Sequence, residues 1–143
     1  MTRLGLMTAA AAALAFSFPA FGQTVGTCRG GSIGPKTPWV LFDLGSSALR
    51  ADAKPVIADA AAKAKATKAV NICLVGQTDK LGDKAMNAKL AEARARAVAA
   101  ELIKDGIPAS MITIAANPEA FGNLSFGSAN ASEKDRRVSI LFK

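Results

Sequence analysis

The sequence predicts an α/β fold, an α+β two-layer sandwich with helices on one face of a four-stranded mixed sheet. Its 143 residues suit one domain of ordinary size. Segments of strand type alternate with two helical segments in the order βαβαβ, and a loop or short helix then leads to a last strand. Half of the residues are hydrophobic, with alanine contributing a large share, so the predicted core is small.

The first 22 residues have the layout of a secretory signal peptide. Arg3 precedes an apolar run from Leu4 to Phe16, and small residues stand three and one positions before a cleavage point after Gly22. A retained membrane anchor is the alternative, but an anchor needs about 20 apolar residues. We therefore expect export and removal of residues 1–22.

The next segment, residues 23–38, is rich in Gly, Thr and Pro and has no apolar period, which predicts a tail or linker. The domain, residues 39–143, begins with the apolar run Trp39–Asp43, a predicted strand. A helix follows, with Asp52 as its expected N-cap and Pro55 in its first turn.

A second strand is expected over Val70–Gly76. Its alternation places Ile72 and Leu74 on one face and Cys73 and Val75 on the other. Gly76 is expected to allow a tight exit from this strand into a polar loop that ends at Gly82.

The longest predicted helix begins at Asp83 or Lys84 and ends at Asp105, with Gly106 as its C-terminal glycine. Further strands are expected over Met111–Ile114 and Arg137–Phe142, joined by a long connection that includes a short helix. The residues expected on the buried side of the long helix are Met86, Leu90, Ala93 and Ala97.

Composition excludes several functional classes. The chain has no histidine, which removes the commonest general base and the commonest transition-metal ligand. We therefore expect no enzyme activity, no metal site and no cofactor. The net charge is +7, but export and an aromatic content of 6% argue against nucleic-acid binding.

Two cysteines, Cys28 and Cys73, lack CxxC spacing, which leaves redox catalysis and zinc binding unsupported. In an oxidising compartment their even number favours a disulfide. Such a bond would draw the tail across the open face of the sheet. Two unrelated thiols, with Cys73 serving as a small strand residue, are the alternative.

Binding chemistry is expected around Arg94, which Leu90 and Val98 flank on the helix and half desolvate. Asn87 lies seven residues earlier on nearly the same face. The preceding loop supplies Thr78 and Asp79. Together, Asp79 and Arg94 suit a zwitterion, because the carboxylate binds an ammonium and the guanidinium binds a carboxylate.

The alternatives are a turn carboxylate for Asp79 and, for Arg94, a packed stem with its charged head in water. Neither residue is expected to supply core area.

Several motifs in order resemble those of OmpA-like C-terminal peptidoglycan-binding domains. The family has a G-x-T-D loop, then N-x-x-L-S-x-x-R-A on a helix, then N-R-R-V on the last strand. The matching residues are Gly76-Gln77-Thr78-Asp79, Gly82, Asn87, Leu90, Arg94-Ala95, Val98 and Arg136-Arg137-Val138, together with Phe42-Asp43 in the first strand. The departures are Gly45, Gln77, Ala91 and Asp135.

The resemblance implies noncatalytic binding of peptidoglycan through the diaminopimelate of its stem peptide. Asp79 and Arg94 would hold the two charges, Asn87 and Arg136 would complete the pocket, and Asp43 would lie at its rim. It also implies a place in the Gram-negative cell envelope, in the periplasm or at the outer membrane. There the domain would link the wall to the envelope, with outer-membrane proteins as further partners.

A periplasmic protein-interaction module with the same fold is the alternative. It would have lost wall binding and would present the lysines of the first helix to acidic partners or lipid headgroups. These lysines are Lys63, Lys65 and Lys68.

Overall fold

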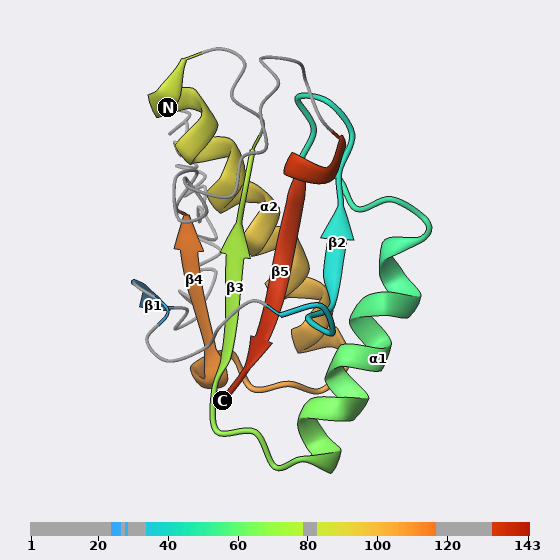
Figure 1. The fold of residues 1–143 in the computed structure, drawn as a ribbon. Helices are drawn as coiled ribbons and strands as arrows, with labels where there is room; N and C mark the ends of the chain where they lie inside the picture. Colours follow the sequence, from blue (N-terminus) through green and yellow to red (C-terminus); the bar gives the residue numbers. More distant parts are fainter. Residues whose placement is uncertain (1–23, 27, 29–33, 79–82, 117–132) are drawn as a thin grey trace, which may run out of the picture.

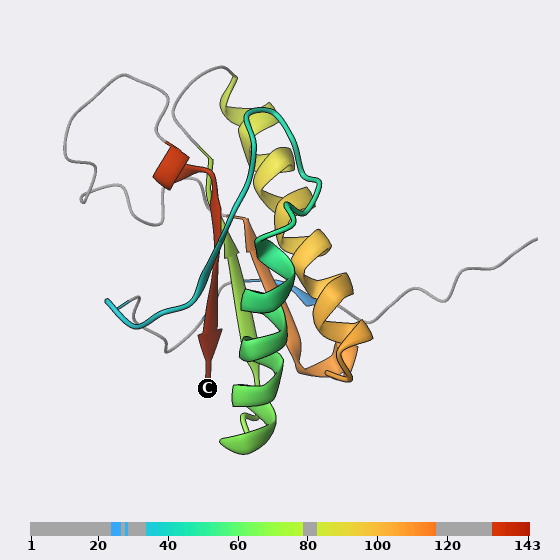
Figure 2. The same cartoon turned by 90° about the vertical axis from the view of Figure 1, so that its right-hand side faces the viewer.

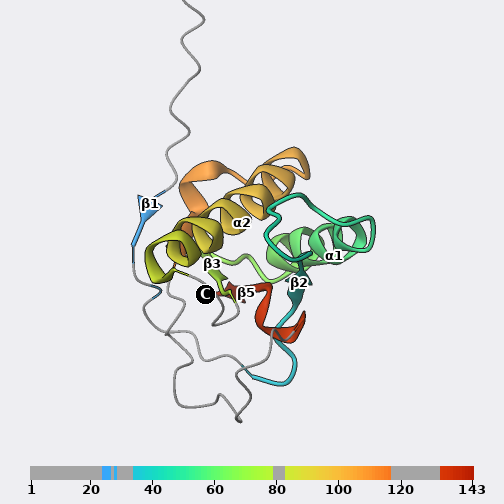
Figure 3. The same ribbon diagram turned by 90° about the horizontal axis from the view of Figure 1, so that it is seen from above.

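The computed structural model describes residues 24–26, 28, 34–78, 83–116 and 133–143. Two helices pack side by side against one face of a mixed sheet, which confirms the predicted fold class (Figures 1, 2 and 3). The strands are β1 (Thr24–Val25), β2 (Trp39–Leu41), β3 (Ile72–Gly76), β4 (Ile112–Ala116) and β5 (Arg137–Phe142). The helices are α1 (Ala53–Ala66) and α2 (Lys84–Lys104), with short 3-10 turns η1 (Ala109–Met111) and η2 (Glu133–Asp135).

The strand order across the sheet is β1-β4-β3-β5-β2. At its centre, β3 pairs in parallel with β4 and antiparallel with β5, and β2 pairs antiparallel with β5. In addition to the four expected strands, two residues of the predicted tail form β1, parallel to β4. This edge strand is too short to produce an apolar period in the sequence. The predicted signal peptide and most of the predicted connection, residues 117–132, lie outside the described residues.

The ends of the two helices follow local sequence signals to different degrees. At the start of α2, the Asp83 carboxylate accepts a hydrogen bond of 2.6 Å from the Ala85 amide, as expected of an N-cap. Beyond its end, Gly106 adopts a φ of +91°, which favours glycine. Asp52 occupies the N-cap position of α1 but makes no capping hydrogen bond, and its carboxylate lies 3.3 Å from Arg50 Nε instead.

The prediction of the buried face of α2 is wrong. Met86 is 63% exposed, and the other three expected residues are half-buried. The buried residues are Ala91, Arg94, Ala95, Val98, Ala99 and Leu102. Because small alanines let the helix approach the sheet closely, the face that packs is the one richest in small side chains rather than the one with methionine.

Close approach also explains Gly76, at the end of β3. A methyl group on Gly76 would lie 2.1 Å from the backbone oxygen of Ala91 in α2. Its backbone does not adopt the left-handed conformation, since the described glycines that do are Gly45 and Gly106. The glycine is therefore required by contact with α2 and not by the tight turn expected from the sequence.

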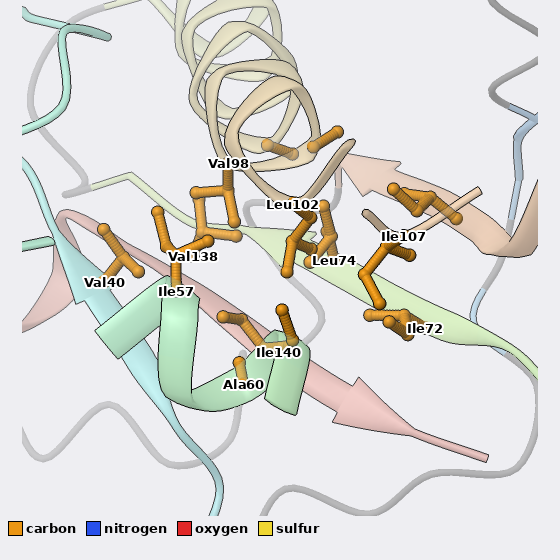
Figure 4. Close-up of a cluster of buried hydrophobic side chains, with 14 of the residues drawn as sticks. Val40, Ile57, Ala60, Ile72, Leu74, Val98, Leu102, Ile107, Val138 and Ile140 are labelled. Carbon is orange, nitrogen blue, oxygen red and sulfur yellow. The ribbon is translucent and has the colours of Figure 1, made fainter. Parts of the chain in front are cut away.

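The main core lies between the sheet and the two helices (Figure 4). Ile72 and Leu74 of β3 and Ile140 of β5 belong to one buried cluster with Ile57 of α1 and Leu102 of α2. All five are fully buried. The predicted alternation along β3 is confirmed by this packing. No helix among the described residues is both long and apolar enough to cross a membrane.

The opposite face of the sheet carries a smaller apolar cluster. It consists of Cys73, Val75, Ala115 and Leu141, and Cys28 packs against it. The structure joins Cys28 to Cys73 as a disulfide, with Cα atoms 5.8 Å apart. Just before Cys28, the Gly26 amide donates a 3.0 Å hydrogen bond to the Ile114 carbonyl. These contacts tie the predicted tail to the face that the helices leave uncovered.

Candidate binding site

Arg94 is the largest fully buried side chain of the described structure. Its guanidinium donates hydrogen bonds to three backbone carbonyl oxygens. Nε lies 2.8 Å from the Ser46 oxygen, Nη2 lies 3.0 Å from the Asp43 oxygen and Nη1 lies 3.3 Å from the Gln77 oxygen. Arg94 thus connects α2 to the loop after β2 and to the end of β3.

The burial of Arg94 corrects two expectations. The side chain is 0% exposed rather than half desolvated, and it occupies core volume. The guanidinium carbon also lies 5.4 Å from the centre of the Phe42 ring. Carbonyl dipoles and an aromatic face offset the cost of burying a cation. Flanking apolar residues signalled desolvation, but local periodicity contains no information about the three distant carbonyls.

The loop after β2 is shaped to present carbonyls to Arg94. Gly45 adopts a φ of +65°, a conformation that strains other residues, between the carbonyls of Asp43 and Ser46. Asp43 therefore lies at the site through its backbone oxygen. Its carboxylate is 72% exposed and lies 3.8 Å from Arg50 Nη1.

Arg136 also reaches this region. Its Nε donates a 3.2 Å hydrogen bond to the carbonyl of Phe42, and its own carbonyl accepts from the Phe42 amide at 2.8 Å. Phe42 therefore joins the two arginines, since Arg94 packs on its ring and Arg136 binds its backbone. The structure brings together Arg94, Arg136 and the Asp43 backbone.

Thr78 follows β3 and is only 4% exposed. Its hydroxyl has no hydrogen-bond partner among the described residues. A buried hydroxyl without a partner costs free energy, which makes it a candidate for contact with a ligand. Asn87 is half-buried in α2, two turns before Arg94. Asp79, predicted as the carboxylate of the site, lies outside the described residues.

An exposed ionic cluster borders the loop and was not predicted from the sequence. Arg50 Nη1 lies 2.7 Å from Glu133 Oε1, which connects the segment before α1 to η2. This hydrogen bond raises the pKa of Arg50 and lowers the pKa of Glu133. The negative charge of Asp52 also raises the pKa of Arg50. Because 83 residues separate the partners, no local pattern could have indicated the pair.

A second group missed by sequence reasoning lies on the sheet face opposite the helices. Arg137 Nε donates a 3.2 Å hydrogen bond to Gln77 Oε1, and its guanidinium carbon lies 4.6 Å from the centre of the Trp39 ring. Burial lowers the pKa of Arg137, while the Asp135 carboxylate acts in the opposite direction. Strand alternation would have placed Trp39 and Arg137 on this face, but it gives no sign of their contact.

Comparison with known proteins decides the family. The model of the OmpA family matches residues 41–139, which include every described element from the end of β2 to the middle of β5. The chain belongs to the OmpA family. Over 99 residues it is 32% identical to outer membrane protein A of Bordetella avium, a match that covers 69% of this chain and 51% of that protein. The chain therefore spans about half the length of this relative.

Solved structures agree with this assignment of the OmpA family fold. The peptidoglycan-associated lipoprotein of Burkholderia pseudomallei has a TM-score of 0.65 at 21% identity, covering 74% of this chain and 90% of that one. The periplasmic domain of Helicobacter pylori MotB has a TM-score of 0.54 at 26% identity, covering 72% of this chain and 69% of that one. At these identities, the first likeness concerns the fold alone.

Proposed function

We propose that this OmpA-family domain binds peptidoglycan noncovalently through the diaminopimelate of the stem peptide. The observation that carries the proposal is the fixed position of the Arg94 guanidinium at the end of β3, which the buried Thr78 hydroxyl directly follows in the chain. The Gln77 carbonyl that accepts from Arg94 belongs to the residue next to Thr78. A carboxylate of the ligand would meet a cation that three carbonyls already orient, so little ordering would be needed on binding.

The zwitterion requires an acidic partner for its ammonium group. We assign that role to Asp79, which follows Thr78 directly in the sequence. Asn87 and Arg136 would bind the remaining polar groups of the ligand, and Asp43 would border the pocket. Every role in this set is one of binding and charge complementarity, which agrees with a noncatalytic domain.

The names of the relatives support a role in the cell envelope. They describe an outer membrane protein, a peptidoglycan-associated lipoprotein and a periplasmic domain. For this chain we infer export after cleavage at Gly22, a periplasmic or outer-membrane location and a link between wall and envelope. We also propose outer-membrane proteins as further partners.

Binding to purified sacculi tests the proposal. Because Arg94 supports the fold, the informative variants are Asp79→Asn and Thr78→Val, which keep the size of each side chain. We expect Asp79→Asn to weaken wall binding by about 2 to 5 kcal/mol, since the ligand ammonium loses its charged partner. Free diaminopimelate should compete with sacculi for the wild type.

The matched control is Asp59→Asn, the same substitution at an exposed position of α1. It should bind sacculi like the wild type. Equal binding by the wild type and a folded Asp79→Asn, Thr78→Val double variant would contradict the proposal. That outcome would favour the alternative of a protein-interaction module that uses Lys63, Lys65 and Lys68.

A further inference from the structure

Trp39 is the single tryptophan of the chain and is 45% exposed. It begins β2, the edge strand, and lies diagonally across from Arg137 of β5, whose guanidinium covers part of its ring. The alternation of β2 buries Val40 in the main core and places Trp39 on the face opposite the helices. An exposed aromatic ring fixed by a neighbouring cation is a rigid contact surface.

Gln77 connects this surface to the candidate binding site. Its side-chain oxygen accepts from Arg137 Nε, whereas its backbone oxygen accepts from Arg94 Nη1. Its amide also donates a 2.8 Å hydrogen bond to the Arg137 carbonyl. One residue therefore contacts the arginine beside Trp39 on one face and the arginine of the candidate site on the other.

A groove with a volume of about 370 Å³ lies beside Trp39, between residues 35–41 and the start of α1. Its lining combines apolar surface from Pro35, Pro38 and Val56 with polar groups from Lys36, Thr37 and Asp52. Residues 34–38 approach β2 from the side of the sheet opposite the helices (Figure 2). This mixture suits a ligand with an apolar face and hydroxyl groups around its rim.

We propose that Trp39 and this groove bind the glycan strand of peptidoglycan, with an N-acetylated hexose ring stacked on the indole. The inference rests on the proposed function, because the wall polymer must first reach this end of the sheet. The C–H groups of the sugar would lie against the aromatic ring. Its hydroxyl and acetamido groups would reach Thr37, Lys36 and the Asp52 carboxylate, which can form hydrogen bonds with them.

The spacing along the sheet fits a single ligand. Gln77 and Leu41 both lie level with Arg137, so Trp39 is two strands and two residues away from Gln77, about 12 Å at ordinary strand spacings. In a stem peptide, two amino acids and a linking group separate the sugar from diaminopimelate, which is roughly 10 Å of extended chain. A muropeptide could therefore occupy both sites by passing over the end of β3 at Gln77.

An extended peptide is the competing occupant, since β2 is an edge strand. Two features favour the sugar. The strand has only three residues, which leaves a short edge for strand addition, and both a lysine and a carboxylate line the groove. A polyhydroxylated ring uses both donors and acceptors of this kind.

The single tryptophan makes a direct test possible. Intrinsic fluorescence of the full chain would be titrated with three probes: a disaccharide muropeptide, the same stem peptide without sugar, and an N-acetylglucosamine oligomer without peptide. We expect the two sugar-containing probes to change the Trp39 emission. Calorimetry should show that Trp39→Ala weakens muropeptide binding by about tenfold and leaves stem-peptide binding unchanged.

Two further variants serve as controls. Trp39→Phe keeps an aromatic ring and should retain most of the muropeptide affinity. Val70→Ala removes apolar surface from a residue that is 75% exposed and belongs to neither site, so its affinity should equal that of the wild type. Circular dichroism and thermal unfolding would verify that each variant is folded.

The outcomes distinguish the two proposals. If the stem peptide binds, but the sugar adds no affinity and Trp39→Ala binds the muropeptide normally, the glycan inference is overturned and the proposed function stands. If the stem peptide fails to bind while the sugar oligomer changes Trp39 emission, the diaminopimelate site is refuted and the glycan inference is supported. A proline-rich or other extended peptide that changes the emission where the sugars do not would overturn the glycan inference.

Discussion

On one face of the sheet, apolar side chains from two helices pack against the central strands, whereas on the other a four-residue cluster packs against the disulfide-bonded Cys28. The helix face also contains Arg94, which is bound by three carbonyls and completely buried. The open face contains Arg137, which packs against the half-exposed ring of Trp39.

The two arginines are therefore held in position in different ways. Arg94 is oriented by the fold itself, so removing it disturbs the structure as well as any ligand contact. Arg137 is half-buried on the open face, where its side chain is more accessible to a ligand than that of Arg94. The surroundings of Arg137 are therefore a better place than those of Arg94 to change binding without changing the fold.

The largest expected effect concerns the helix face. Arg94→Ala should lower the free energy of unfolding by about 3 to 5 kcal/mol, because the carbonyls of Asp43, Ser46 and Gln77 lose a charged donor inside the protein. Urea unfolding would measure the change. Arg96→Ala provides the control on the same helix, since its side chain is 48% exposed and paired with Glu92. A control change within about 0.5 kcal/mol is expected, and equal losses for both variants would show that Arg94 has no special structural role.

The disulfide should make the next largest contribution, on the open face. Cys28→Ser opens a loop of 45 residues and should destabilise the oxidised protein by about 4 kcal/mol in the chain-entropy model. Chemical unfolding of the variant should match that of the reduced wild type. Thiol titration of the oxidised, unfolded wild type should find no free cysteine, and two reactive thiols would refute the bond.

A smaller effect is expected where β3 meets α2. Gly76→Ala inserts a methyl group 2.1 Å from the Ala91 backbone oxygen and should cost about 1 to 3 kcal/mol through overpacking. Gly34→Ala is the control, because a methyl group there has nothing within 4 Å. Thermal unfolding would compare the two, and an unchanged Tm for Gly76→Ala would mean that α2 is less closely packed than the structure indicates.

The sequence predicted the bounds of those helices and strands whose ends are set by nearby residues. The β5 strand begins and ends where its alternation predicted, and both Asp83 and Gly106 mark the ends of α2. The second strand was predicted two residues too early. Val70 is 75% exposed and lies outside β3, in the connection between α1 and this strand.

Features that depend on distant residues were not predictable in the same way. The buried face of α2 is set by contact with the sheet, and its alanines give a weak hydrophobic signal. The motif identified Arg94 as important, but no pattern indicated that its partners are the backbone oxygens of Ser46, Asp43 and Gln77. The contact between Trp39 and Arg137 joins residues 98 positions apart in sequence.

The position of β5 within the sheet has a consequence for how the chain folds during synthesis. Although β5 is the last strand of the described chain, it lies between β3 and β2. The edge strand β2 has no partner in the sheet until residues about 100 positions later become available. A nascent chain that lacks β5 would therefore expose Val40, Leu74 and their neighbours, and the sheet closes only after β5 has been synthesised.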